Sequence, residues 1–179
     1  DLVACTAYDR AGDQIRKNAT LLSNAEAVEI EKEAKGDVAP ITSDRTGFYN
    51  RKLYLKPGER VENRGNNQPL NHKLIRLGEV YLNYAEACAK TNAEDEARIY
   101  LKKIRERAGL PEIQSTGDQL FEDIINERRL ELGLEGFRFF DIVRVGWASK
   151  TFKNFKAGAE VLPIPQTEVD ISKGEITNK

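Results

Sequence analysis

The sequence predicts a mainly α-helical protein built from paired helices, with long irregular loops and minor β structure. Apolar residues recur at helical spacing through the middle of the chain, from residue 73 to residue 145. Glycine and proline stand where those helical stretches end. The flanking stretches lack this periodicity, and residues 37–71 contain repeated glycine, proline and asparagine. These three observations together favour helices joined to irregular segments.

Residues 1–71 are expected to be irregular apart from one short helix and one short strand. A weak helical rhythm predicts the helix over roughly residues 24–35. Alternating apolar and polar residues over residues 48–55 suggest the strand.

A first helix pair is predicted over residues 72–111. Its first helix, residues 73–90, has apolar residues at helical spacing at Leu74, Leu77, Tyr81, Ala85 and Cys88. Its second helix runs from about residue 94 to residue 108, and Gly109 and Pro111 end it. The string Leu77-Gly78-x-x-Tyr81 with the later alanines resembles a tetratricopeptide repeat, in which small residues let two helices approach closely. One such pair cannot bury both of its faces, so neighbouring helices are expected.

A second helix pair is predicted over residues 117–146, followed by an irregular tail over residues 147–179. Asp118 is the expected N-cap of its first helix, which should continue to about Gly136. The second helix of this pair is short and aromatic, from Phe137 to Val145.

The composition excludes several classes of protein. The 179 residues include 28 basic and 29 acidic side chains, which leaves a net charge of −1 and no electrostatic signature of a nucleic-acid partner. The longest apolar runs have four residues, whereas a membrane-spanning helix needs about 20. One histidine, two distant cysteines and the lack of phosphate- or dinucleotide-binding motifs indicate neither a metal nor a cofactor.

A row of carboxylates is the densest candidate for chemistry. Glu127, Glu131 and Glu135 follow one another at four-residue intervals, so they share one face of a helix. One interpretation is a glycoside hydrolase that uses Glu127 and Glu131 as its carboxylate pair. The other is an ion-pair network with Arg128 and Arg138 that joins the third helix to the fourth. We favour the network and assign no catalytic residue, because close arginines keep carboxylates ionised and oppose a general-acid role.

The tail contains the candidate ligand-binding residues, Trp147 and Phe152. Lysines alternate with the aromatic residues there, at Lys150, Lys153 and Lys156. Exposed aromatic rings can stack on the faces of sugars, but they can equally cover the end of a core. Arg144 is placed to pair with Asp141, three residues before it.

Four motifs in order resemble the SusD/RagB family of nutrient-binding lipoproteins. The first resembles the hallmark helix of that family, and the others follow in the family's order: Arg76-Leu77-x-Glu79-Val80-Tyr81-Leu82-x-Tyr84-Ala85-Glu86-Ala87, Ile104-Arg105-x-Arg107-Ala108-Gly109-Leu110, the segment Ile125 to Arg144 with its glutamate row, and Leu162-Pro163-Ile164-Pro165-x-x-Glu168. Upstream, residues 47–52 resemble the family's short strand before that helix. The resemblance spans residues 47–168.

The resemblance implies a SusD-like superhelical scaffold of tetratricopeptide-like repeats and a function without catalysis. Family members bind glycans, or peptides in some cases, on the extracellular face of the outer membrane of Bacteroidetes-type bacteria, as part of polysaccharide utilisation. They hand the nutrient to a SusC-type TonB-dependent transporter. The chain contains no methionine, and its motifs match the C-terminal portion of such a protein. The lipid anchor would therefore lie in a missing N-terminal part. The alternatives are a tetratricopeptide-type scaffold for protein partners and the hydrolase named above.

Overall fold

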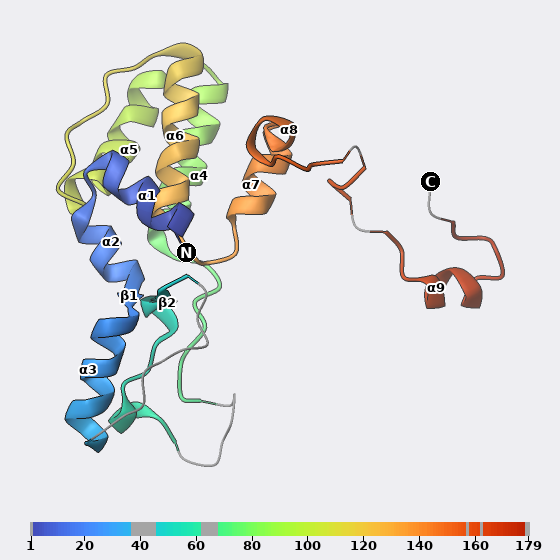
Figure 1. Cartoon of the computed structure of the whole chain (residues 1–179). Helices are drawn as coiled ribbons and strands as arrows, with labels where there is room; N and C mark the ends of the chain where they lie inside the picture. Colours follow the sequence, from blue (N-terminus) through green and yellow to red (C-terminus); the bar gives the residue numbers. More distant parts are fainter. Residues whose placement is uncertain (1, 37–45, 62–67, 157, 162, 178–179) are drawn as a thin grey trace. The chain divides into compact units, whose positions relative to one another are not determined.

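The protein is mainly helical, as its sequence predicts. The structure, a computed structural model, describes residues 2–36, 46–61, 68–156, 158–161 and 163–177. The chain forms two compact units, Asp1–Phe137 and Arg138–Lys179, which are described separately (Figure 1). Within the described part of the chain, no helix has the length and apolar character needed to cross a bilayer.

The first unit begins with three helices, two of which the sequence did not predict. They are α1 (Leu2–Ala11), α2 (Gln14–Thr20) and α3 (Asn24–Lys35). The expected irregular chain over residues 1–71 is therefore wrong up to residue 35, except for α3, whose range is as predicted. The buried side chains of α2 are Arg16 and Thr20, so this helix carries no apolar periodicity. Residues 37–45 and 62–67 of the expected irregular stretch lie outside the described residues.

A small antiparallel sheet follows these helices. Strand β1 (Leu21–Ser23) pairs with β2 (Phe48–Asn50), with Leu22 opposite Tyr49. The strand predicted over residues 48–55 ends early because the Asn50 side chain accepts a hydrogen bond from the Lys52 backbone N–H. This cap starts the 3₁₀ turn η1 (Arg51–Leu53), and a second turn, η2 (Pro57–Glu59), comes after it.

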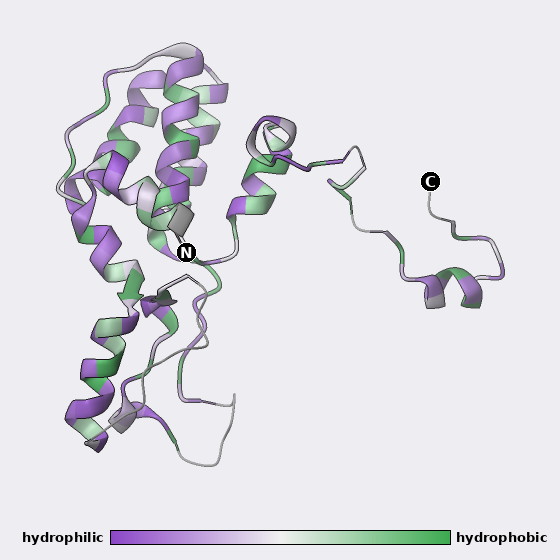
Figure 2. Ribbon diagram, viewed as in Figure 1, coloured by the Kyte–Doolittle hydropathy of each residue, from purple (hydrophilic) through white to green (hydrophobic). Residues whose placement is uncertain are grey.

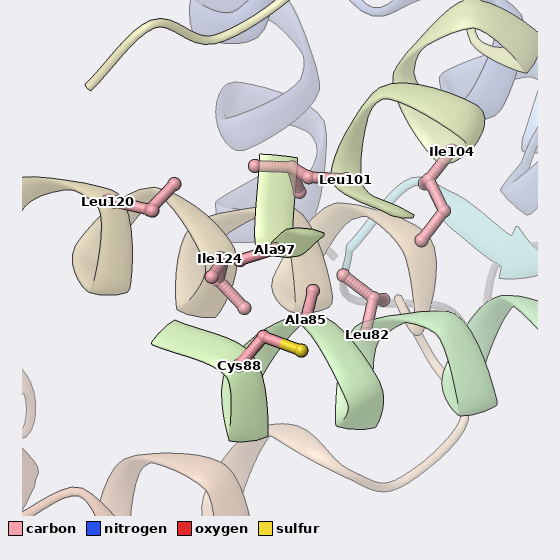
Figure 3. Packing of buried hydrophobic residues seen from close by; sticks show 8 residues of the cluster. All are labelled: Leu82, Ala85, Cys88, Ala97, Leu101, Ile104, Leu120 and Ile124. Carbon is pink, nitrogen blue, oxygen red and sulfur yellow. The ribbon is translucent and has the colours of Figure 1, made fainter. Parts of the chain in front are cut away.

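Three longer helices form the core of the first unit. They are α4 (Leu77–Lys90), α5 (Glu94–Arg107) and α6 (Gly117–Glu131), and α4 packs against both of the others. Hydrophilic and hydrophobic residues mix along each helix (Figure 2), as expected of helices with one buried face. Figure 3 shows the buried cluster between them, which consists of Leu82, Ala85, Cys88, Ala97, Leu101, Ile104, Leu120 and Ile124. Cys88 is thus a buried small hydrophobic residue.

The first helix pair occurs as predicted, with a shifted start. Helix α4 begins at Leu77 rather than residue 73, and the side chains of Leu74 and Leu77 are exposed instead of buried. Arg76 precedes the helix with an extended backbone, and its side chain reaches α6, as described below. Three residues link α4 to α5, so the two helices form a hairpin.

Helix α6 starts at Gly117 as predicted, but its N-cap residue differs and it ends earlier. Thr116 rather than Asp118 occupies the N-cap position, and the helix ends at Glu131 rather than near Gly136. The chain turns out of the helix at Leu134, whose positive φ of 62° is unusual for a residue with a side chain. Because of this turn, Glu135 does not continue the helical row of Glu127 and Glu131 that the sequence predicted.

The described residues of the second unit form three short helices. They are α7 (Arg138–Arg144), α8 (Ala148–Thr151) and α9 (Gln166–Ile171). The tail was predicted to be irregular from residue 147, but it contains two helices of one to two turns, α8 and α9. Pro165 precedes α9. Because α6 and α7 belong to different units, their pairing stays a prediction.

Candidate functional site

The carboxylate row of α6 is buried and surrounded by arginines. Glu127 and Glu131 expose only 1% and 3% of their surface. Arg105 Nη1 donates to Glu127 Oε2 at 2.7 Å, and Arg16 Nη2 lies 2.6 Å from Glu127 Oε1. Arg76 and Arg107 both donate to Glu131 Oε1, and Arg16 Nη1 donates to Glu131 Oε2 at 3.3 Å. Each buried carboxylate is therefore held by at least two guanidinium groups.

The arginines come from elements far apart in the sequence. Arg16 belongs to α2, Arg76 precedes α4, and Arg105 and Arg107 form part of the last turn of α5. The network predicted from the sequence thus exists, and it joins α6 to α2, to α5 and to the residue that precedes α4. Of the two arginines named from the sequence, Arg128 donates from Nη1 to Asn83 Oδ1 at 2.5 Å, and a contact of Arg128 or Arg138 with the glutamate row stays a prediction. Spacing along one helix could not reveal partners on other helices.

Two cationic side chains, those of Arg76 and Lys52, bind the C-terminal end of α6 and the residues that follow it. Arg76 donates from Nε and Nη2 to the two carboxylate oxygens of Glu135, at 2.7 Å each. Lys52 Nζ donates to the carbonyl oxygens of Glu131 and Gly133 at 3.1 and 2.9 Å, and it also pairs with Glu135. Carbonyl groups at a helix C-terminus have no partner within the helix. These contacts therefore satisfy the last turn and fix the chain that leaves it.

Gly78 makes room for this network. A Cβ atom at residue 78 would lie 2.6 Å from Glu131 Oε1 and 3.1 Å from Arg76 Nη1. The likeness to a tetratricopeptide repeat predicted instead that Gly78 lets the two paired helices approach closely. The structure assigns it a different role, since the nearest atoms belong to the buried ion pair.

The electrostatics of Glu131 oppose a catalytic role as a general acid. Burial raises its pKa, but hydrogen bonds from Arg107 and Arg76 and the charges of both arginines outweigh burial and lower the pKa to about 2. A general acid at neutral pH needs a raised pKa. Burial also raises the pKa of Glu135, but hydrogen bonds from Arg76 and Lys52 and the charges of both groups outweigh burial and lower it. These contacts favour the charged forms of Glu131 and Glu135.

Trp147 and Phe152 lie at the two ends of α8 in the second unit, at the N-cap and C-cap positions. Lys150 Nζ lies 4.0 Å from the centroid of the Trp147 ring. The Phe152 ring is in contact with two other rings, at centroid distances of 5.9 Å to Phe139 and 6.2 Å to Phe155. Both candidate side chains are half-buried, and their role in ligand binding stays a prediction. Arg144 pairs with Asp141 at 2.9 Å as expected.

A tyrosine cluster on α4 and α5 is a further aromatic surface. The ring centroid of Tyr100 lies 5.3 Å from that of Tyr81 and 4.5 Å from that of Tyr84. Lys103 Nζ lies 4.3 Å from the Tyr100 centroid. Tyr84 is 46% exposed, so this tyrosine cluster reaches the surface. The spacing of Tyr81 and Tyr84 was the available signal for it.

The remaining candidates are isolated. His72 is exposed and precedes α4, and Cys5 and Cys88 are free thiols. In the described ranges, no three histidine, cysteine, aspartate or glutamate side chains come together as metal ligands would.

Comparison with known proteins identifies the family. The sequence model of the SusD family matches residues 14–163, which is most of the chain. The chain belongs to the SusD family. Among curated SusD-like proteins, one from Bacteroides ovatus is 39% identical over 80 residues, which cover 43% of this chain and 14% of the relative. SusD-like protein P2 from Formosa agariphila is 34% identical over 126 residues, which cover 60% of this chain and 25% of the relative.

Solved structures of SusD-like proteins share the fold. A laminarin-binding SusD-like protein superposes on 97% of this chain and 36% of its own, with a TM-score of 0.69 and 31% identity. A SusD-like protein from Bacteroides fragilis superposes on 58% of this chain and 25% of its own, with a TM-score of 0.54 and 27% identity. The SusD-like chain described here therefore spans between about a seventh and about a third of the lengths of these relatives.

Proposed function

We propose that this SusD-like protein binds a glycan at the bacterial outer-membrane surface without chemically altering it. One observation carries the proposal, namely the structural likeness to a laminarin-binding SusD-like protein over 97% of the chain. Membership of the SusD family supports the same conclusion. The low pKa of Glu131 and its three arginine contacts support a structural role for the carboxylates, and so a function without hydrolysis.

Two aromatic surfaces are the candidate contacts for a sugar. One consists of Trp147 and Phe152 in the second unit, and the other is the tyrosine cluster of Tyr81, Tyr84 and Tyr100. Aromatic faces bury the apolar face of a sugar ring while its hydroxyl groups stay in water or donate hydrogen bonds. Lys150 and Lys103, which lie against these rings, supply donors at the rim of each surface.

The test is binding of laminarihexaose, measured by isothermal titration calorimetry. The unmodified protein should bind it. Trp147→Ala and Phe152→Ala should each weaken binding at least fivefold if the second unit provides the contact, and Tyr84→Ala should do so if the tyrosine cluster provides it. Tyr49→Ala, in the two-stranded sheet, is the matched control for loss of an aromatic ring. Absence of binding to laminarihexaose and to a panel of other oligosaccharides and peptides would contradict the proposal.

The absence of catalysis has its own assay. Incubation with laminarin should release no new reducing ends, for the unmodified protein and for Glu127→Gln alike. Release of reducing ends that disappears in Glu127→Gln or Glu131→Gln would instead support the glycoside hydrolase alternative.

We also propose that the parent protein is lipid-anchored on the extracellular face of the outer membrane and hands its ligand to a SusC-type TonB-dependent transporter. Family membership supports this location and partner. Protease treatment of intact cells should cleave the parent protein, and affinity purification from detergent-solubilised membranes should recover the transporter with it. Protection from protease in intact cells, together with recovery of soluble partners only, would favour the alternative of a scaffold for protein partners.

A further inference from the structure

Helix α4 is apolar over a wider arc than one buried face requires. Measured around the helix axis at about 100° per residue, its apolar arc runs from Val80 to Leu82 and spans about 200°. A helix with one face in a core needs an apolar stripe of only about 100°. Tyrosines aside, the polar and charged side chains of the helix all lie outside the arc, and they are Glu79, Asn83, Glu86 and Lys90.

The core uses one half of this arc. Leu82, Ala85 and Cys88 are buried in the cluster that α4 shares with α5 and α6 (Figure 3). The paired helix α5 has no comparable surplus of apolar surface. Its apolar stripe runs from Tyr100 to Leu101 and spans about 100°, and Ile99 is the one apolar residue of that helix outside the stripe.

The other half of the arc is exposed. Leu77, Val80 and Tyr84 follow one another at spacings of three and four residues, and they are 62%, 45% and 46% exposed. We call these three residues the α4 stripe. Directly before the helix, Leu74 and Ile75 are exposed as well. Large apolar side chains that are exposed together mark a surface that meets another molecule or another part of the protein.

The chemistry of the α4 stripe fits a helix better than a sugar. Leu77 and Val80 are aliphatic, so they offer a sugar neither an aromatic face nor a hydrogen-bonding group. Single exposed apolar residues are common on protein surfaces. A row at spacings of three and four residues is instead the pattern by which one helix packs against another.

The source of such a helix follows from the length of the relatives. The laminarin-binding neighbour matches 97% of this chain with only 36% of its own length, so most of a protein of that length lies outside the matched part. In tetratricopeptide-like arrays, a helix hairpin buries its second face against the next hairpin. Helix α6 already packs against α4 and α5, and the α4 stripe remains for a further neighbour.

We propose that a further amphipathic helix covers the α4 stripe in the parent protein, and that the part of the parent chain outside these 179 residues supplies it. Leu77 and Val80 are then core residues of the parent protein. Tyr84 belongs to the α4 stripe and to the tyrosine cluster, so the covering helix leaves Trp147 and Phe152 as the sugar contacts. The proposal does not depend on which glycan is bound.

The test is hydroxyl-radical footprinting of the 179-residue chain and of the parent protein, measured by mass spectrometry. Leu77 and Tyr84 should be oxidised readily in the 179-residue chain and about fivefold more slowly, or less, in the parent protein. Ile15 of α2 is the matched control, because its exposure is close to that of Leu77. It should be oxidised at the same rate in both proteins.

The substitution Leu77→Glu gives a second readout. In the 179-residue chain the new charge stays in water, so the unfolding temperature should change by less than about 1 °C. In the parent protein the same charge is buried under the covering helix, and the unfolding temperature should fall by about 3 °C or more. Ile15→Glu, the control, should have little effect in either protein.

Three results would overturn the proposal. The first is equal oxidation of Leu77 in the two proteins, and the second is an equal response of both proteins to Leu77→Glu. The third is slow oxidation of Leu77 in the 179-residue chain itself, and a dependence on protein concentration would then identify a second copy as the occupant. Titration of laminarihexaose into the parent protein reports the proposed function separately.

Discussion

At the scale of the residue, Glu131 is the point on which three arginines converge. Arg16, Arg76 and Arg107 all contact its carboxylate, which is 3% exposed. Removing the charge by Glu131→Gln leaves these guanidinium groups without their anion in a desolvated site, which typically costs about 3–5 kcal/mol. We expect a decrease of roughly 3 kcal/mol in the free energy of unfolding, measured by urea denaturation.

The control for this variant is Glu33→Gln, which changes an exposed glutamate on α3. It should alter the unfolding free energy by less than about 0.5 kcal/mol. If both variants lost the same small amount, the network around Glu131 would contribute nothing specific to stability.

Gly78 is the second residue at which a substitution should have a clear effect on stability. A methyl group at this position would lie 2.6 Å from Glu131 Oε1, and that oxygen cannot move without breaking its contacts with Arg76 and Arg107. The strain outweighs the better helix propensity of alanine, so Gly78→Ala should lower the unfolding free energy by about 2 kcal/mol. Thermal or urea unfolding measures this change.

Gly58→Ala provides the comparison, because a Cβ atom at residue 58 meets nothing within 4 Å. That variant should be neutral or slightly stabilising. A neutral Gly78→Ala would mean that the buried carboxylate can shift at little cost.

Single residues also show how far the sequence could be interpreted. The burial of Cys88 and the ionic role of the glutamate row followed from helical spacing, because both depend on one helix face. The arginines that hold the row could not be predicted, since Arg16 lies 115 residues from Glu131.

At the scale of the element, a buried hydrogen bond joins α1 to the end of α6. The Tyr8 hydroxyl donates to the Leu130 carbonyl oxygen at 2.7 Å. In Tyr8→Phe the ring still fills its space, but the carbonyl group loses its donor, which costs about 1–2 kcal/mol. In this variant, amide hydrogen exchange should become faster in α1 than it is in the unmodified protein, and exchange in α4 and α5 should change less.

Tyr49→Phe is the matched control, because it removes a hydroxyl group from a tyrosine of the small sheet. The ring of Tyr49 contacts that of Tyr54. This variant should leave exchange in α1 unchanged. Uniform acceleration across α1, α4 and α5 in Tyr8→Phe would indicate global destabilisation instead of local release of α1.

The elements that the sequence predicted well are those with an apolar face. Helix α5 and most of α4 and α6 bury alanine, leucine and isoleucine at helical spacing, so their existence was predictable. Helices α1 and α2 were missed. Among the buried side chains around them are Asp13, Arg16 and Thr20, which give no apolar period. The packing of α2 is polar, and polar packing depends on partners that lie elsewhere in the chain. Helix α1 packs Ala4, Ala7, Tyr8 and Ala11 into a small apolar cluster, but its apolar residues are too few and too small to have predicted it.

At the scale of the whole molecule, the protein family and the mainly helical fold class could be predicted from the sequence. The order of the motifs and the helical periodicity can both be recognised without knowledge of tertiary contacts. The fold of the neighbour that binds laminarin covers nearly all of this chain, and the same helix pair that predicted the fold carries the first family motif. The ligand surface was less predictable. Aromatic rings can form a ligand-binding surface only where helices from different parts of the chain bring them together, and spacing along the sequence does not reveal that arrangement.

The ion-pair network should also set how the first unit responds to acid. The pKa of Glu131 falls from 4.5 to about 2 on folding, and the pKa of Glu135 and of Glu31 is lowered as well. A carboxyl group whose pKa is lower in the folded state stabilises the fold above its unfolded pKa. That contribution disappears as the pH falls through the folded pKa. For Glu131 it amounts to about 3 kcal/mol, present above pH 5 and largely lost near pH 2.

Urea denaturation at pH values from 7 to 2.5 measures this loss. The unmodified protein should keep its stability down to about pH 5 and lose it progressively below. In Glu131→Gln one of the titrating groups is absent, so the curve should begin lower at pH 7 and fall less steeply. The two curves should therefore converge in acid, because protonation of Glu131 removes the same charge that the substitution removes. Parallel curves across this range would show that Glu131 has the same pKa in the folded and unfolded chains, and that its arginines do not hold it as the geometry requires.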